Sequence, residues 1–115
     1  MALHEVKAVQ SIVSLVLDEA TKQQASRIVR VSIKSGEWST MDPDCVRTYF
    51  DQAAKGTIAE GAEVAIESVP VRFKCSECGT SYSPAKVCCP TCSGKKGEIV
   101  SGREFYVESI EVAHA

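Results

Sequence analysis

The sequence has no long hydrophobic run. The apolar stretch near its start, Leu15-Val16-Leu17, is far shorter than the roughly 20 residues that span a bilayer. The start also lacks the sustained apolar segment of a secretory signal, because Glu5 and Lys7 interrupt it. We therefore expect a cytoplasmic protein without membrane association, in which thiols stay reduced and disulfides are disfavoured.

An excess of positive charge is missing as well. The 115 residues include 13 basic and 15 acidic side chains, which leaves a net charge of −2. A broad cationic surface for nucleic acid is therefore excluded, and we expect no nucleic-acid partner. The hydrophobic fraction of 44% and the charged fraction of 24% are those of an ordinary globular protein. A chain of this length fits one compact domain, with room for a small appendage.

Histidine is scarce, and catalytic signatures are missing. The two histidines, His4 and His114, lie at the chain ends, and the sequence contains neither a P-loop nor a Ser/His/Asp set. We interpret His114, in the tail, as a solvated side chain. These observations predict a protein that is not an enzyme.

Periodicity in the first half of the chain predicts a helix, a strand and a second helix. Apolar residues of the first segment recur at steps of three and four: Val6, Val9, Val13, Val16 and Ala20. In the next segment Val29, Val31 and Ile33 alternate with polar residues as in a half-buried strand, which Ser35-Gly36-Glu37 ends. Asp42-Pro43 is a helix start, with Asp42 as N-cap, and Gly56 is placed to end that helix.

The second half predicts two more strands around a segment rich in cysteine. One strand runs from about Ala62 to Phe73, and Pro70 makes it an edge strand or breaks it. The other runs from Glu104 to Val112. The predicted class is α+β, with two helices packed on a small three-stranded sheet. We expect one domain from residues 1–72 and 103–115, and an inserted zinc-ribbon module from residues 73–102.

Four of the six cysteines form two matched pairs. Cys75-Ser76-Glu77-Cys78-Gly79 is followed, ten residues later, by Cys89-Pro90-Thr91-Cys92. A CxxC turn places two thiolates on one side of a tight loop, and two facing turns supply the four tetrahedral ligands of a structural zinc site. The predicted ligands are Cys75, Cys78, Cys89 and Cys92.

Alternatives to zinc at these cysteines stay open on the pattern alone. Similar knuckles hold iron in rubredoxin-like electron-transfer proteins, and a zinc ribbon can also serve as a module that binds nucleic acid or protein. Electron transfer would leave the larger helix-and-sheet part unexplained. Cys88 would give the wrong spacing to Cys92, and Cys45 is interpreted as a small apolar side chain, so neither is assigned to the site.

The remaining signals are short motifs spread along the chain. They are His4-Glu5, Ser35-Gly36-Glu37, Met41-Asp42, the twin cysteine knuckles, and Glu108-Ser109-Ile110-Glu111-Val112. In order and spacing, from His4 to Val112, this pattern resembles the HypA/HybF family of hydrogenase-maturation nickel chaperones. The resemblance implies a nickel-binding helix-and-sheet domain with a zinc domain inserted before the last strand.

The resemblance also implies the nickel ligands and the partners. In the family a Met-His-Glu start binds Ni(II) through the His ring and backbone nitrogens, and a nearby aspartate matters for nickel. The matching residues here are His4, Glu5 and Asp42. Implied partners are a hydrogenase large-subunit precursor, a maturation GTPase and urease-maturation proteins. We expect a monomer or a weak dimer, with nickel as cargo and zinc as a structural ion.

The start of the chain departs from the family pattern. His4 is preceded by three residues rather than one. Removal of Met1 would leave Ala2-Leu3-His4, whose amine, two amides and imidazole form a square-planar N₄ site suited to Ni(II). With Met1 retained, nickel would use the His4 ring and the amides of His4 and Glu5.

Overall fold

The chain forms two compact units. The computed structural model describes residues 3–39, 41–83, 89–90, 94 and 97–114, without the side chains of residues 3–5. The first unit comprises Met1–Lys34, Thr40–Glu67 and Tyr106–Ala115, and the second comprises Ser35–Ser39 and Ser68–Phe105. The domain limits expected above, at 72/73 and 102/103, stay a prediction.

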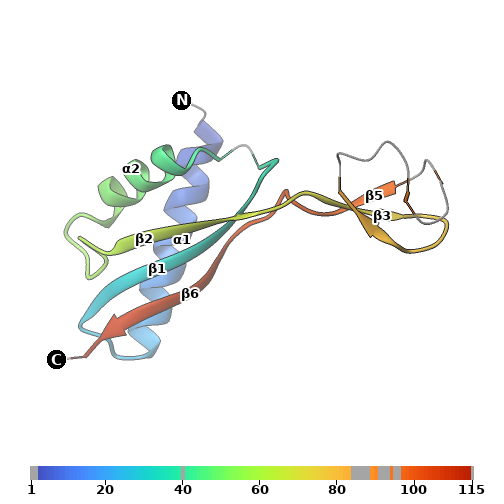
Figure 1. The fold of residues 1–115 in the computed structure, drawn as a ribbon. Coiled ribbons are helices and arrows are strands. Elements are labelled where there is room, and N and C mark those ends of the chain that lie inside the picture. The colour runs from blue at the N-terminus through green and yellow to red at the C-terminus, as the bar shows by residue number, and fades with distance from the viewer. Residues whose placement is uncertain (1–2, 40, 84–88, 91–93, 95–96, 115) are drawn as a thin grey trace. The chain divides into compact units, whose positions relative to one another are not determined.

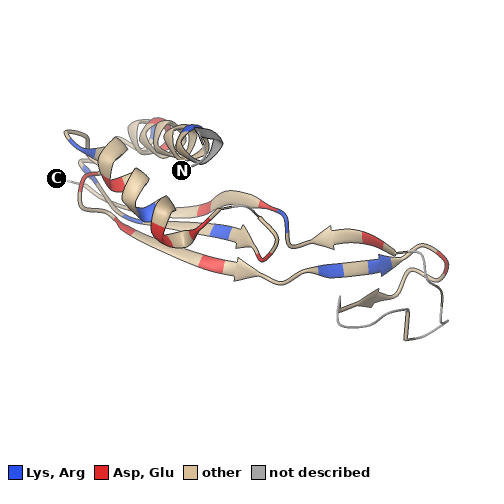
Figure 2. Cartoon of the chain, turned by 90° about the horizontal axis from the view of Figure 1, so that it is seen from above, with Lys and Arg blue, Asp and Glu red and all other residues tan. Residues whose placement is uncertain are grey.

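Two amphipathic helices belong to the first unit. Helix α1 spans Leu3–Lys22 and helix α2 spans Pro43–Ala54 (Figure 1). The predicted start of α2 is confirmed, because Asp42 is its N-cap and Pro43 its first residue. The helix ends at Ala54, just before Gly56, whose φ of +78° suits glycine. Figure 2 shows both helices on one face of the sheet.

The sheet of the first unit has three strands in the order β2-β1-β6. They span Glu63–Val69 (β2), Arg27–Gly36 (β1) and Phe105–Ala113 (β6). The core between the sheet and the helices is mainly aliphatic, with Phe50 as its largest fully buried side chain. Its other fully or nearly fully buried members are Val9, Val13, Val16, Ala20, Ile28, Val31, Ile33, Val46 and Ala54.

The predicted alternation in β1 is wrong at its first position. Val31 and Ile33 are buried as expected, but Val29 is 37% exposed, and Ile28 is buried instead. Both Val29 and Arg30 lie outside the core, so the strict alternation of the strand is interrupted between Ile28 and Val31. The burial pattern therefore shifts by one residue there.

The second unit contains a sheet of its own. Its strands span Arg72–Cys75 (β3), Ser81–Tyr82 (β4) and Gly97–Ser101 (β5), in the order β4-β3-β5. All pairings are antiparallel, with Phe73 opposite both Tyr82 and Ile99. The single strand expected from Ala62 to Phe73 is broken at Pro70, which divides it into β2 and β3.

The turn after β1 is held tightly within the second unit. The Gly36 N–H donates to Glu104 O (2.7 Å), and the Trp38 N–H donates to Gly102 O (2.7 Å). A Cβ on Gly36 would lie 2.1 Å from the carbonyl carbon of Gly102, so only glycine fits there. Strand β1 therefore continues through Gly36, where the sequence predicted a break.

These observations confirm the α+β class. Two helices pack on a small three-stranded sheet, and the cysteine segment lies in the unit that has the second sheet. None of the described helices is long and apolar enough to cross a membrane.

Candidate metal centre

The first cysteine pair sits on a tight hairpin between β3 and β4. Cys75 ends β3, its N–H donates to Thr80 O (2.9 Å), and the Gly79 N–H donates back to Cys75 O (2.9 Å). Gly79 has a φ of +78°, a conformation that glycine adopts without strain. This turn directs the thiols of Cys75 and Cys78 to the same side, as the CxxC spacing predicted.

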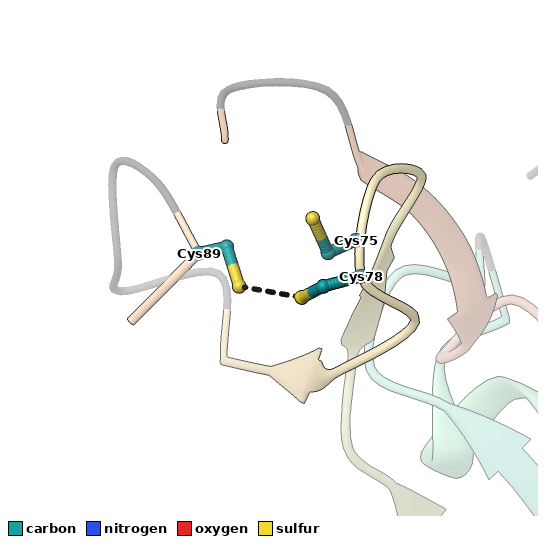
Figure 3. A group of neighbouring side chains, drawn as sticks. All are labelled: Cys75, Cys78 and Cys89. Carbon is teal, nitrogen blue, oxygen red and sulfur yellow. Dashed lines mark hydrogen bonds between the residues drawn. The ribbon is translucent and has the colours of Figure 1, made fainter. Parts of the chain in front are cut away.

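Cys89 approaches this hairpin from the second knuckle. Its N–H donates to the carbonyl of Gly94 (2.9 Å). The Sγ atoms of Cys75, Cys78 and Cys89 all lie within 4.8 Å of one another, and in Figure 3 the thiols of Cys78 and Cys89 face each other with Cys75 beside them. Cys92, the predicted fourth ligand, and Cys88 lie outside the described residues.

The spacing of the three thiols fits a metal site better than a disulfide. The Sγ atoms of Cys78 and Cys89 are 3.5 Å apart, well beyond the roughly 2.05 Å of an S–S bond. A tetrahedral zinc ion with Zn–S bonds of about 2.3 Å would separate its sulfur ligands by about 3.8 Å. Three soft sulfur donors at this spacing form a cluster that could hold a metal ion.

The cysteine cluster is partly shielded from solvent. Cys75 and Cys89 are 2% and 0% exposed, whereas Cys78 is exposed. The Cys78 thiol also contacts Thr80 Oγ1 at 3.2 Å, a neighbour that was not predicted from the sequence. A hydroxyl two residues beyond the second cysteine of a knuckle is the signal that could have indicated it.

A small aromatic cluster covers the buried thiols. Tyr82 is buried with Cys75 and Cys89, and Phe73 packs against this group. The rings of Phe73 and Tyr82 lie 5.7 Å apart, and Trp38 packs edge-on against Phe73 at 5.9 Å. The sequence does not indicate the contact between Phe73 and Tyr82, because it depends on the antiparallel register of β3 and β4.

The predicted nickel residues lie in the first unit. His4 and Glu5 fall in the first turn of α1, which starts at Leu3. Asp42 is exposed, and its Oδ1 accepts the N–H groups of Asp44 (2.8 Å) and Cys45 (3.4 Å). Capping of α2 therefore explains the contacts of Oδ1, one of the two carboxylate oxygens of Asp42.

The other histidine has a contact that the sequence did not indicate. His114 is exposed, and its Nε2 lies 2.9 Å from the carbonyl oxygen of Gln23, just beyond the end of α1. A histidine at a helix C-terminus meets carbonyl groups that lack partners within the helix.

Comparison with known proteins decides the family. Residues 3–112 match the model described as "Hydrogenase/urease nickel incorporation, metallochaperone, hypA". The chain belongs to the HypA family. It is similar to the hydrogenase maturation factor HypA of Caldanaerobacter subterraneus subsp. tengcongensis, with 35% identity over 96% of this chain and 99% of that protein. A HypA from Picosynechococcus sp. is 34% identical over the same shares of the two chains.

Solved HypA structures share the fold. A solution structure of a HypA protein superposes with a TM-score of 0.84 at 27% identity and covers all of both chains. The solution structure of the Ni metallochaperone HypA from Helicobacter pylori gives a TM-score of 0.71 at 27% identity, over 96% of this chain and 98% of that one. The HypA family is one of nickel metallochaperones in hydrogenase maturation, which confirms the predicted family and its general role.

Proposed function

We propose that this HypA-family protein takes up Ni(II) at the start of α1 and delivers it during [NiFe]-hydrogenase maturation. The observation that carries the proposal is the family match over residues 3–112, which includes His4, Glu5 and Asp42. The first four N–H groups of an α-helix have no partner within the helix. Backbone nitrogens at His4 and Glu5 are therefore available as ligands without loss of helical hydrogen bonds.

A terminal site also suits a protein that must release its cargo. The ends of helices fray with little free-energy cost, so a ligand set in the first turn opens more easily than a buried cage. We propose the His4 imidazole and neighbouring backbone nitrogens as the donors that hold Ni(II), with the Ala2 amine as a further donor if Met1 is removed. Asp42 would contribute its carboxylate.

The experiment is a nickel titration followed by absorbance, on protein whose N-terminus has been checked by mass. We expect His4→Ala to lose most of the nickel affinity, whereas His114→Ala, a change at the only other histidine, should keep it. Equal affinity of His4→Ala and unaltered protein would rule out the N-terminal site. Unchanged binding after N-terminal acetylation would rule out only the amine as a ligand.

We propose that the cysteine cluster holds a structural zinc ion, with Cys92 as the fourth ligand. Three sulfur atoms within 4.8 Å of one another and the backbone hydrogen bonds of Cys75 and Cys89 support this assignment. The second unit has a short sheet and only a small buried cluster, so metal binding would supply much of its folding free energy. Its role would be to hold this unit folded, not to react.

Metal analysis of the isolated protein tests this assignment. We expect about one zinc per chain in the unaltered protein and in Cys45→Ser, and its loss in Cys75→Ser. Red protein that bleaches on reduction would instead indicate a rubredoxin-like iron centre. Full zinc content in Cys75→Ser would show that another residue replaces this ligand.

The partners follow from the proposed delivery. We propose that Ni(II) passes to a hydrogenase large-subunit precursor in the cytoplasm, with the help of a maturation GTPase, and that urease-maturation proteins are further acceptors. Reduced thiols, which zinc needs, persist in that compartment. A transfer assay with nickel-loaded protein and purified precursor should fail for His4→Ala and succeed for His114→Ala.

A further inference from the structure

A hollow of about 350 Å³ opens between α1 and β6. Its apolar wall is formed by Leu15 and Val16 of the helix and by Val107 and Ile110 of the strand. Leu15 is 55% exposed, although it lies in the middle of a helix whose other large apolar side chains are mostly covered. Such exposure of a leucine beside a hollow leaves apolar surface that a further segment could cover.

Strand β6 borders this hollow and is an edge of the sheet. The order β2-β1-β6 gives it β1 as a neighbour on one side, and no described residue forms a strand on its other side (Figure 1). It is nine residues long, from Phe105 to Ala113. An edge of this length presents a row of backbone donors and acceptors that can pair with an added strand.

Charge at the rim indicates the chemistry of the occupant. Glu19 of α1 and Glu108 of β6 line the hollow, and no lysine or arginine is among its lining residues. Glu108 lies 3.6 Å from Lys34, on the face of the sheet away from the helix, and Lys34 also pairs with Glu67, so one lysine there faces two carboxylates. A segment with basic residues between its apolar ones complements this rim.

The same charges disfavour a second copy of the chain as the occupant. Antiparallel pairing of β6 with its own copy about a two-fold axis would bring the exposed carboxylates of Glu108 and Glu111 near those of the partner. Like charges across a strand pair are destabilising. A partner that differs from this chain avoids that repulsion.

We infer that the groove between α1 and β6 is a docking site for an extended segment of another protein, in which apolar residues alternate with Lys or Arg. The segment pairs with the free edge of β6 as a fourth strand. Its apolar side chains on the helix side cover Leu15 and Val16, and its basic ones, which point to the opposite face of the sheet, meet Glu108. Nickel plays no part in this contact, so the site stands independently of the metal-binding proposal.

A synthetic seven-residue peptide with capped ends, Lys-Val-Lys-Val-Lys-Val-Lys, is the probe. A Lys-Gly peptide of equal charge controls for attraction to the acidic protein, and a Glu-Val peptide controls for apolar content. We expect the Lys-Val peptide to bind at least tenfold more tightly than either control and to slow hydrogen exchange of amides in residues 105–113. Strand β2, the other edge of the sheet, is the internal control and should not change.

Substitutions then locate the contact. Leu15→Lys should weaken binding about tenfold or more, because the buried leucine contact is lost. Val100→Lys is the matched control, since Val100 is similarly exposed, at 51%, but lies in the second unit, and it should have no effect.

Three results with the peptides and the Leu15 variant would overturn the inference. They are equal binding of the Lys-Val and Lys-Gly peptides, protection of β2 instead of β6, and unchanged affinity of Leu15→Lys. Concentration-dependent dimerisation of the protein alone that Leu15→Lys abolishes would assign the groove to a second copy, and would refute a foreign partner as well.

Discussion

Asp42 has one observed role, as the cap of α2, and one proposed role, as a nickel ligand, and a single carboxylate can combine them. Its Oδ1 caps α2 through the N–H groups of Asp44 and Cys45, a role that needs an oxygen acceptor but no net charge. The proposed nickel role needs a carboxylate donor. The capping role was readable from Asp42-Pro43 because it depends on local sequence alone, whereas a metal role depends on what the fold brings near it.

Asparagine at position 42 separates these roles. Asp42→Asn keeps an acceptor for the cap, so the melting temperature should stay close to that of unaltered protein, while nickel affinity falls. Asp42→Ala removes both, and it should also lower the free energy of unfolding by about 1 kcal/mol. Thermal unfolding and nickel titration of both variants measure the two effects. Unchanged nickel affinity in Asp42→Asn would leave Asp42 as a cap only.

Among the elements, central strand β1 is tied to both neighbours through one side chain. Lys34 Nζ donates to Glu67 of β2 and lies 3.6 Å from Glu108 of β6. The hydrogen bond to Glu67 raises the pKa of the Lys34 ammonium above its ordinary 10.5, and the charge of Glu108 adds to this rise. The ion pairs therefore link three strands on the face of the sheet opposite the core.

The stabilisation from Lys34 should vanish in alkaline solution. Because its pKa is raised on folding, its contribution is complete below pH 10.5, the unfolded value, and is lost as the pH rises through the higher folded value. Lys34→Met should unfold at lower denaturant concentration than unaltered protein at neutral pH, and this difference should shrink above pH 10.5. Lys7→Met, at an exposed lysine on α1, serves as the control. A difference independent of pH would show that Lys34 acts by packing alone.

The elements also show where sequence patterns were sufficient. Both helices followed from apolar spacing and the Asp42 cap, since these signals are local. The end of β1 did not, because Gly36 is fixed by its close approach to Gly102, a contact between distant segments. Strand β5 was missed, because its five residues follow no clear alternation and are held by pairing with β3. Three of the four predicted thiols lie together: the pairing of Cys75 with Cys78 follows from local CxxC geometry, whereas Cys89 reaches them from the second knuckle.

For the whole molecule, two units with separate buried clusters predict two cores that unfold separately. Both helices belong to the first unit, whereas Trp38, the only tryptophan, belongs to the second. The backbone N–H of Trp38 donates a hydrogen bond to Gly102 O, and its ring packs edge-on against Phe73. Phe73 in turn packs on Tyr82, which is buried beside Cys75 and Cys89. Helical circular dichroism and tryptophan fluorescence therefore report on different units.

Zinc removal should separate these two signals. With a chelator present, we expect the second unit to lose the cluster around its thiols, so that Trp38 loses its contact with Phe73 and its emission shifts to longer wavelength. The helical signal should remain, because the core of the first unit is mainly aliphatic and contains no cysteine among its described fully buried side chains. Phe73→Leu should shift the emission before chelator is added and reduce the further change, while Tyr106→Leu, at an exposed aromatic of the first unit, should not. Loss of helical signal in step with the fluorescence change would show instead that one cooperative transition unites the two units.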